Sequence, residues 1–489
     1  MPKHAIALSA LLAVSAGPAL ADLSAQDLWN DWRDLAETLG ATLTGTGETY
    51  ADGRLSLDGF TLSIDAGDTE SVTEYGGFAM VEQEDGSVRI DWPETMAVSS
   101  TTTIDGEEVV QSGTLTSSDY DVTVRDEGEE RIYDFSLASG TYAFDDLAAG
   151  QGEEVVAATF GMTNLVGRYV NREDGTTLST DQNFTADSVT IDVTGEGENP
   201  FTFDYALTDV VSAFAGSFDT SVPREEMTLA TMGATAGGEI THSGSALRID
   251  ATSETEPVAI AGTSGSGSIG FDIGADTLGY TLTSRDVTLQ VNPPDFPSPV
   301  EIAMAEATSG IALPVGVSDE AKPFALTLAY RDVTVDDTIW ALFDPTGQLP
   351  RDAATILLDL SGSALMKADI FGDPEAMAAL SGPPGELKTL DLTQLRVALA
   401  GAELRGSGAV EFPNPTPVPE PVGSVTLALD GGLALLDRLV ALGFVPGQQA
   451  TFVKGMIGAV ARPVGEDQLE SEIVFSEGGG ISANGLPLR

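Results

Sequence analysis

Cysteine is absent from this 489-residue chain, and histidine occurs only twice, at His4 and His242. The lack of cysteine excludes disulfides, thiolate nucleophiles, zinc–thiolate sites, iron–sulfur clusters and a lipid anchor on an N-terminal cysteine. With His242 as the single histidine beyond the first residues, histidine-rich metal sites are excluded and most nucleophile–base pairs lose their usual base. We expect His242 to be solvated or locally hydrogen-bonded, because it lies in a strand-to-turn context.

Basic residues are also scarce, since 22 Lys and Arg stand against 76 Asp and Glu and give a net charge of −54. Such a surface repels nucleic acid and anionic head groups, so no nucleic-acid partner is expected. The acids are spread along the whole chain, which is typical of a solubilising surface. The alternative is cation binding or a basic partner protein.

Long apolar runs are missing after residue 21. Lys3 and His4 precede an apolar stretch of small residues, and Ala19, Leu20 and Ala21 form an A-x-A cleavage site. This pattern predicts a signal peptide over residues 1–21 that is cleaved after Ala21, and therefore a periplasmic protein. No later segment offers about 18 uninterrupted apolar residues, so no transmembrane segment is expected after cleavage.

Sequence motifs for catalysis are lacking too. The chain contains no G-x-S-x-G elbow, no phosphate-binding G-x-x-x-x-G-K-[ST] loop and no calcium loop of the D-x-[DN]-x-[DN]-G type. Residues 265–270 match G-x-G-x-x-G, but strand-like sequence follows, so we expect a turn there rather than a dinucleotide site. We predict no catalytic residue, no cofactor and no metal site, and hence a protein that is not an enzyme.

The sequence does contain repeated alternation of apolar and polar residues, which is typical of strands with one buried face. It occurs in residues 60–64, 120–124, 133–137, 189–193, 201–207, 287–291 and 324–328. Asp-Gly dipeptides, which suit tight hairpins, recur along the same region. This predicts a mainly β fold built of extended, curved antiparallel sheets.

A helix over residues 24–40 and a few short crossing helices complete the predicted fold. Ser24 can cap the first helix, and Leu28, Trp32 and Leu35 share one of its faces. The predicted organisation is a signal peptide (1–21), an N-terminal β-rich half that opens with this helix (22–323) and a C-terminal β-rich half with short helices (324–489).

Three segments share one shape, a short apolar run that ends in an aliphatic residue followed by proline: residues 210–223, 339–350 and 433–446. We interpret each as a short helix that crosses the end or the open face of a sheet, with chance resemblance as the alternative. In the middle copy, Trp340 and Leu342 are predicted to line a core or groove. Arg351 either anchors a carboxylate or phosphate or forms a salt bridge with Asp344, Asp352 or Asp359.

Residues 339–355 resemble an exported alphaproteobacterial family that carries the domain of unknown function numbered 2125. Four further segments support this resemblance, at 404–408, 423–427, 442–446 and 484–485. The similarity covers about residues 325–489, and the family supplies no catalytic residues. A more distant likeness, in overall texture only, is to AsmA-like envelope proteins whose long sheets form lipid-holding grooves.

Three hypotheses follow for function. The first is a non-enzymatic envelope protein that is structural or binds a hydrophobic ligand such as lipid. The second is a secreted carbohydrate-active hydrolase, which needs two carboxyl groups about 5 to 10 Å apart in a cleft. The third is an acidic protein that binds a partner, for example another envelope protein.

Overall fold

The computed structural model describes residues 22–489 apart from 66–68, 105–106, 149–154, 198, 224–226, 254–255, 294–295, 297–298, 371–379, 381 and 415–418. The proposed signal peptide, residues 1–21, therefore lies outside the described residues. The predicted fold class is confirmed, because the chain is mainly β with antiparallel strands and has an N-terminal helix. It forms two compact units, residues 1–261 and residues 262–489. The division after residue 323 that the sequence suggested falls inside the second unit.

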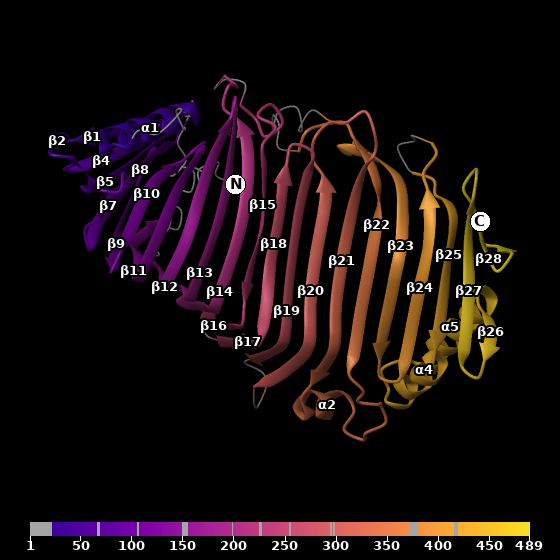
Figure 1. Cartoon of the computed structure of the whole chain (residues 1–489). Helices are drawn as coiled ribbons and strands as arrows, with labels where there is room; N and C mark the ends of the chain where they lie inside the picture. The colour runs from indigo at the N-terminus through magenta and orange to yellow at the C-terminus, as the bar shows by residue number, and fades with distance from the viewer. Residues whose placement is uncertain are drawn as a thin grey trace. The chain divides into compact units, whose positions relative to one another are not determined.

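Unit 1 begins with a helix and continues as antiparallel strands, as Figure 1 shows. Its elements are α1 (Ala25–Thr38), β1 (Ala41–Thr46), β2 (Thr49–Ala51), β3 (Arg54–Ser56), β4 (Gly59–Asp65), β5 (Thr69–Gly76), β6 (Ala79–Glu82), β7 (Val88–Asp91), β8 (Thr95–Ile104), β9 (Glu107–Ser118), β10 (Asp121–Glu127), β11 (Glu130–Ala148), β12 (Val155–Asp174), β13 (Thr177–Glu196), β14 (Phe201–Asp219), β15 (Thr235–His242), β16 (Gly244–Ser253) and the greater part of β17 (Glu256–Ser264), which continues past residue 261. The predicted cap is present, since the backbone N–H of Asp27 donates to Ser24 Oγ at 3.0 Å.

The sheet of unit 1 forks at β11. The first part of β11 pairs with β10, and its second part pairs with β9. One arm continues through β7, β6 and β3, and the other through β8, β5, β4 and β1. Apolar side chains from α1 and both arms form one buried cluster, with Trp29 fully buried at its centre. The fork thus gives unit 1 a closed core.

Unit 2 consists of antiparallel strands that follow one another in chain order. Its elements are β18 (Ser266–Gly274), β19 (Thr277–Asn292), β20 (Val300–Pro314), β21 (Lys322–Val335), α2 (Asp337–Phe343), β22 (Ala354–Met366), β23 (Gly385–Leu399), β24 (Ala402–Glu411), β25 (Val422–Asp430), α4 (Gly432–Ala441), α5 (Gly447–Val460), β26 (Arg462–Gly465), β27 (Gln468–Ser476), β28 (Gly480–Ala483) and β29 (Leu486–Pro487). Each strand from β18 to β25 pairs with the next, and β25 then pairs with β27.

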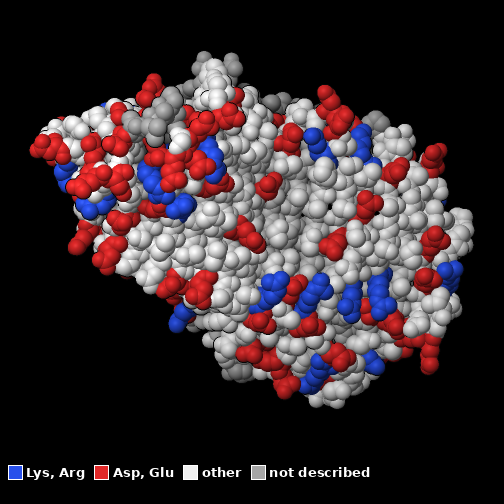
Figure 2. All heavy atoms as spheres, viewed as in Figure 1, with Lys and Arg blue, Asp and Glu red and all other residues white. Residues whose placement is uncertain are grey.

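These strands of unit 2 lie side by side in a single layer, with α2, α4 and α5 near one end of them (Figure 1). On the face of unit 2 that Figure 2 shows, uncharged side chains cover the middle of the strands, and charged side chains gather toward their ends. The helix predicted within residues 433–446 is confirmed by α4, and α5 follows it along the chain. The G-x-G-x-x-G stretch lies largely in β18 rather than in a turn.

The prediction of a crossing helix at residues 210–223 is wrong. Residues up to Asp219 form the second part of β14, which pairs with β13 on one side and with β15 on the other. Buried Val210 and Ser212 alternate with exposed Val211, as a strand requires. Pairing with two neighbouring strands therefore outweighs the local likeness to the two helical segments.

Several long strands contain one Asp or Asn residue with a left-handed backbone. In unit 2 these are Asp286 in β19 (φ 52°) and Asp332 in β21 (φ 54°), and in unit 1 they are Asn164 and Asp209. Asp and Asn tolerate this conformation better than other residues with a side chain, because they bond locally to the backbone. The pairing of β21 with β22 is irregular at this point, between Tyr330 and Val333, as in a β-bulge.

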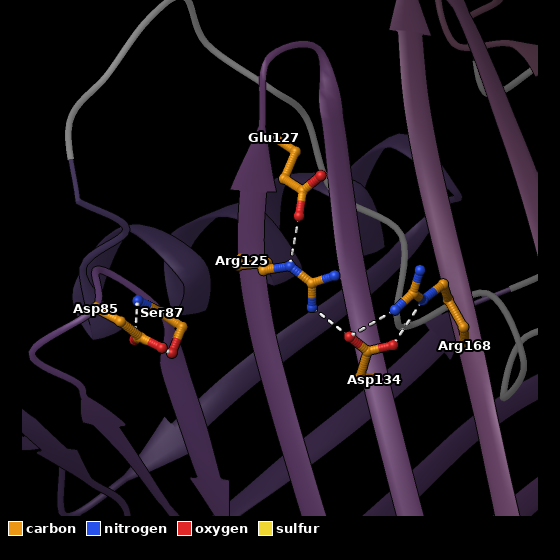
Figure 3. A network of polar contacts seen from close by, with 6 residues as sticks. All are labelled: Asp85, Ser87, Arg125, Glu127, Asp134 and Arg168. Carbon is orange, nitrogen blue, oxygen red and sulfur yellow. Dashed lines mark hydrogen bonds and ion pairs between the residues drawn. The ribbon is translucent and has the colours of Figure 1, made fainter.

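Ion pairs in unit 1 link neighbouring strands. Figure 3 shows Asp134 of β11 between two arginines, where it accepts from Arg168 Nε at 2.7 Å and from Arg125. Arg125 also donates to Glu127 at 2.8 Å. Burial raises the pKa of Asp134, but the hydrogen bonds from the two arginines outweigh it and hold the pKa below the usual value of 3.8.

Arg131 is the most deeply buried charge of unit 1, with 4% of its side chain exposed. It donates to both carboxylate oxygens of Asp126, at 2.7 and 2.9 Å, and also to Asp31 of α1. Burial raises the pKa of Asp31, and the Arg131 guanidinium opposes that rise. This contact ties α1 to the sheet.

Replacing this arginine is expected to destabilise unit 1. Arg131→Met leaves two carboxylates without their cation, so the free energy of unfolding should fall by about 3–5 kcal/mol. Urea unfolding followed by tryptophan fluorescence measures this, because three of the four tryptophans, Trp29, Trp32 and Trp92, lie in unit 1. The matched control is Arg248→Met, which replaces a side chain that is 67% exposed beside Asp250, so the free energy of unfolding should hardly change. Equal effects of the two variants would contradict the assigned role.

Acid is expected to weaken unit 1 through Asp134. Because its folded pKa lies below the unfolded value of 3.8, its contribution is present above about pH 4 and is lost as the pH falls through the folded pKa. In urea unfolding at pH 6 and pH 3, Asp134→Asn should lose less stability between the two pH values than the unchanged protein does. Asp121→Asn, which replaces an exposed carboxylate of β10, should keep the full loss.

Candidate ligand-binding face

One face of the unit 2 sheet is apolar over many adjacent strands. Residues that are paired across antiparallel strands place their side chains on the same face. In β21 and β22 these pairs are Leu326 with Leu360, Leu328 with Leu358, and Tyr330 with Ile356. The same face continues onto neighbouring strands through Leu278, Tyr280, Leu282, Ile311, Leu313, Phe324, Leu390, Leu392, Leu395, Val397, Leu404, Val425, Leu427, Leu429, Ile473 and Phe475. We call this surface the apolar face.

Side chains of the apolar face are mostly half-buried or exposed. Tyr280 is 42% exposed, and Ile311, Leu326 and Ile356 are each 38% exposed. The clusters of fully buried apolar residues that the described chain forms both lie in unit 1. The single sheet layer of unit 2 explains why its apolar side chains stay partly exposed. They touch their neighbours along the sheet, but only a second layer could cover them.

The opposite face of the same strands carries mainly small, polar and charged residues, with Leu357 of β22 as a buried exception. Thr327, which neighbours Leu326 in β21, pairs with Asp359 on this side. Near one end, Glu306 lies 3.0 Å from Arg331 and 3.8 Å from Arg285. Glu403 likewise pairs with Arg396 and Arg405, each at 2.7 Å. The hydrogen bond from Arg405 has the largest effect on the pKa of Glu403 and lowers it. The hydrogen bond from Arg396 and the charges of both arginines lower this pKa as well, and together they outweigh burial, which raises it. The two faces of unit 2 are therefore chemically distinct.

Helix α2 follows β21 at one end of the apolar face. Asp336 caps it, because the backbone N–H of Ile339 donates to its carboxylate at 3.1 Å. The turn after α2 is organised by Asp344, which is buried and accepts from the N–H of Leu349 at 2.6 Å and from the Thr346 hydroxyl at 3.2 Å. Burial raises the pKa of Asp344. The hydrogen bonds from these donors and from the N–H of Gln348 lower it by more, so the pKa lies below its usual range.

Helix α4 lies beside α2 at the same end. Its first backbone N–H groups, those of Leu433 and Ala434, donate to the carboxylate of Asp467 at 3.1 and 2.9 Å. The rings of Phe343 and Phe444 approach to 6.3 Å between centroids. The two segments that the sequence interpreted as one structural device are thus in contact.

An apolar hollow of about 350 Å³ lies between α2, α4 and the end of the sheet. It is lined by Val335, Ile339, Trp340, Phe343, Leu349, Leu399, Ala400, Leu435, Leu439 and Phe444. Leu399 belongs to the apolar face, as the pairing of β23 with β24 places it in line with Leu395 and Val397. The hollow is therefore continuous with the apolar face.

The three residues singled out from the sequence have different surroundings. Trp340 lines the hollow, whereas Leu342 is 56% exposed and lies outside its lining. Arg351 donates to Asp337 at 2.7 Å, and its guanidinium lies over the Trp340 ring, 5.6 Å from the centroid. The salt bridge of Arg351 therefore goes to Asp337 and not to the acids that were expected.

Sequence reasoning missed several residues of the hollow, notably Leu399, Leu435 and Phe444. The repeated apolar-to-proline shape of 339–350 and 433–446 was the signal that could have paired the two helices. Leu399 gave no such signal, because its place depends on the register of β23.

His242 is buried at the end of β15 and hydrogen-bonded to the backbone of Gly244, so of the two expectations local hydrogen bonding is confirmed and solvation is not. Burial lowers the pKa of its imidazole. Among the described residues, no group of three or more His, Asp or Glu is arranged to hold a metal ion. No helix in this part of the chain combines the length and apolar character needed to cross a bilayer.

A second hollow in unit 2, of about 570 Å³, lies toward the other end of the strands. Its lining includes Asp272 of β18, Asp391 of β23 and the Phe324 ring. The two carboxylates are five strand spacings apart, roughly 24 Å along the sheet. This separation exceeds what a glycoside hydrolase needs between its two carboxyl groups, so these two do not form the pair that the second hypothesis requires.

Comparison with known protein families, with curated proteins and with solved structures finds no match to this chain.

Arg351→Ala separates the two roles considered for this residue. If Arg351 pins the turn, losing an exposed ion pair and a cation–π contact should lower the free energy of unfolding by about 1 kcal/mol. Bound ligand should then be retained. Urea unfolding by circular dichroism and mass spectrometry of bound lipid measure the two effects, with Arg351→Lys as the control that keeps the charge. Loss of ligand at unchanged stability would support the anchor role instead.

Proposed function

We propose that this protein is an exported envelope protein of the periplasm that binds a hydrophobic ligand, a lipid acyl chain, along the apolar face of unit 2. The observation that carries the proposal is the exposure of that face, where Tyr280, Ile311, Leu326 and Ile356 are 38–42% exposed and most other large apolar side chains are only half-buried. Large exposed apolar surfaces mark binding sites in soluble proteins. The role is non-enzymatic, and the compartment rests on the sequence of residues 1–21.

The shape and chemistry of the face suit an acyl chain. Rows of Leu, Ile and Val offer contacts without hydrogen-bond donors or acceptors, which an acyl chain does not need. Each methylene group that leaves water contributes about 0.8 kcal/mol, so a chain laid along the strands can bind tightly without any polar contact. The hollow between α2 and α4 offers space for the end of a chain. The resemblance to the exported family and to AsmA-like groove proteins belongs to the same proposal.

Mass spectrometry of organic extracts tests the proposal on the full chain purified without detergent. We expect co-purified lipid, and we expect added lipid to raise the midpoint of thermal unfolding because the ligand binds only the folded state.

A pair of variants one residue apart sharpens this test. Leu326→Glu places a charge on the apolar face, where desolvating it opposes ligand binding, so bound lipid should fall at least about tenfold. Thr327→Glu adds the same charge to the same strand on the opposite face and should leave bound lipid unchanged. Circular dichroism checks that both variants fold. Extracts free of lipid, or equal loss in the two variants, would refute the acyl-chain proposal.

A further inference from the structure

Helix α5 is apolar, yet most of it is exposed. Ala450 is its one buried residue. Phe452 is 66% exposed and Met456 is 53% exposed, and Phe444, just before the helix, is 51% exposed. A β-carbon added at Gly455 or Gly458 would meet no other atom within 4 Å. The outer side of α5 is therefore without a covering in the described part of the chain.

Such a helix is poorly suited to face water. Glycine weakens a helix, and a helix of this length is marginal in water unless an apolar face is packed against something. Because its largest apolar side chains point away from the rest of the unit, we expect another surface to cover α5 when the protein works.

The charge of this region differs from that of the whole chain. Between Asp437 and Glu466 there is no Asp or Glu, whereas the full sequence has 76 of them against 22 Lys and Arg. The same stretch holds three bases, Arg438, Lys454 and Arg462. Lys454 pairs with Asp437 at 2.6 Å and Arg462 pairs with Glu470 at 2.7 Å, so the surface is close to neutral. It is a place where this acidic protein can approach a lipid surface without strong repulsion.

We propose that α5 and the preceding Phe444 dock unit 2 onto the surface of a lipid bilayer. Phe452, Met456 and Phe444 enter the boundary between head groups and acyl chains, as the apolar residues of interfacial helices do. Lys454 keeps its ammonium group among the head groups while its stem lies along the helix. Neutral zwitterionic lipid is the favoured partner, because the net charge of −54 opposes contact with an anionic surface.

The location of α5 connects this surface to the apolar face. Phe444, which is exposed at the docking surface, also lines the hollow between α2 and α4. A bilayer at α5 would therefore lie beside one end of the proposed acyl-chain site. The docking itself does not depend on a ligand in that site.

Vesicle flotation with the full chain tests the docking. We expect the protein to float with phosphatidylcholine vesicles, and Phe452→Glu with Met456→Glu should lower the ratio of bound to free protein at least about tenfold, because charges enter the interface poorly. Val317→Glu is the matched control: Val317 is 62% exposed in the turn after β20, at the end of β21 opposite to α2. This variant should float as the unchanged protein does.

Several results would overturn the docking proposal. These are failure to float, equal loss in the control, binding only when the vesicles contain anionic phosphatidylglycerol, or a dimer in analytical ultracentrifugation that Phe452→Glu abolishes. The last result would assign α5 to contact between two copies of the chain. Leu326→Glu separates this proposal from the acyl-chain proposal, because it should lose lipid on extraction and still float.

Discussion

Cross-strand pairing of apolar residues without a second layer above them is the constraint that shapes unit 2. Leu326, Leu328 and Tyr330 each face an aliphatic partner on β22, and the hydrogen-bonded ladder fixes that register. The pairs hold neighbouring strands together, but they leave their outer surfaces in water. The apolar side of this sheet is therefore only partly covered by the unit itself, and the acyl chain proposed as its ligand would cover it.

Unit 1, in contrast, buries its apolar side chains within itself. Its sheet forks at β11, so two arms and α1 enclose one buried cluster, and Arg131 fastens the helix through two carboxylates. The same kind of strand therefore gives a packed core in one unit and an open apolar surface in the other. The difference lies in the fork and the helix rather than in the composition of the strands.

Much of the fold could be predicted from the sequence, because alternation of apolar and polar residues reports a one-sided strand directly. The segments at 201–207, 287–291 and 324–328 are strands, and α1 and α4 lie where helices were predicted. The segment at 210–223 failed because pairing partners far along the chain decided its structure. The hollow could be predicted only in part. Trp340 was identified from its own segment, but Leu399 and Phe444 reach it through register and helix contact, which no local pattern encodes.

The left-handed residues within long strands have a consequence for how such sequences are interpreted. In β19 the apolar positions are even-numbered up to Leu282 and odd-numbered from Val287 onward, with Asp286 between them. In β21 the same change occurs around Asp332, and Val335 beyond it lines the apolar hollow together with Leu399. One residue with a left-handed backbone thus shifts the alternation of apolar and polar residues by one position, while the apolar side chains stay on the same face of the sheet. An Asp or Asn at a phase change, which would otherwise mark the end of a strand, can instead be a sign that one long strand continues.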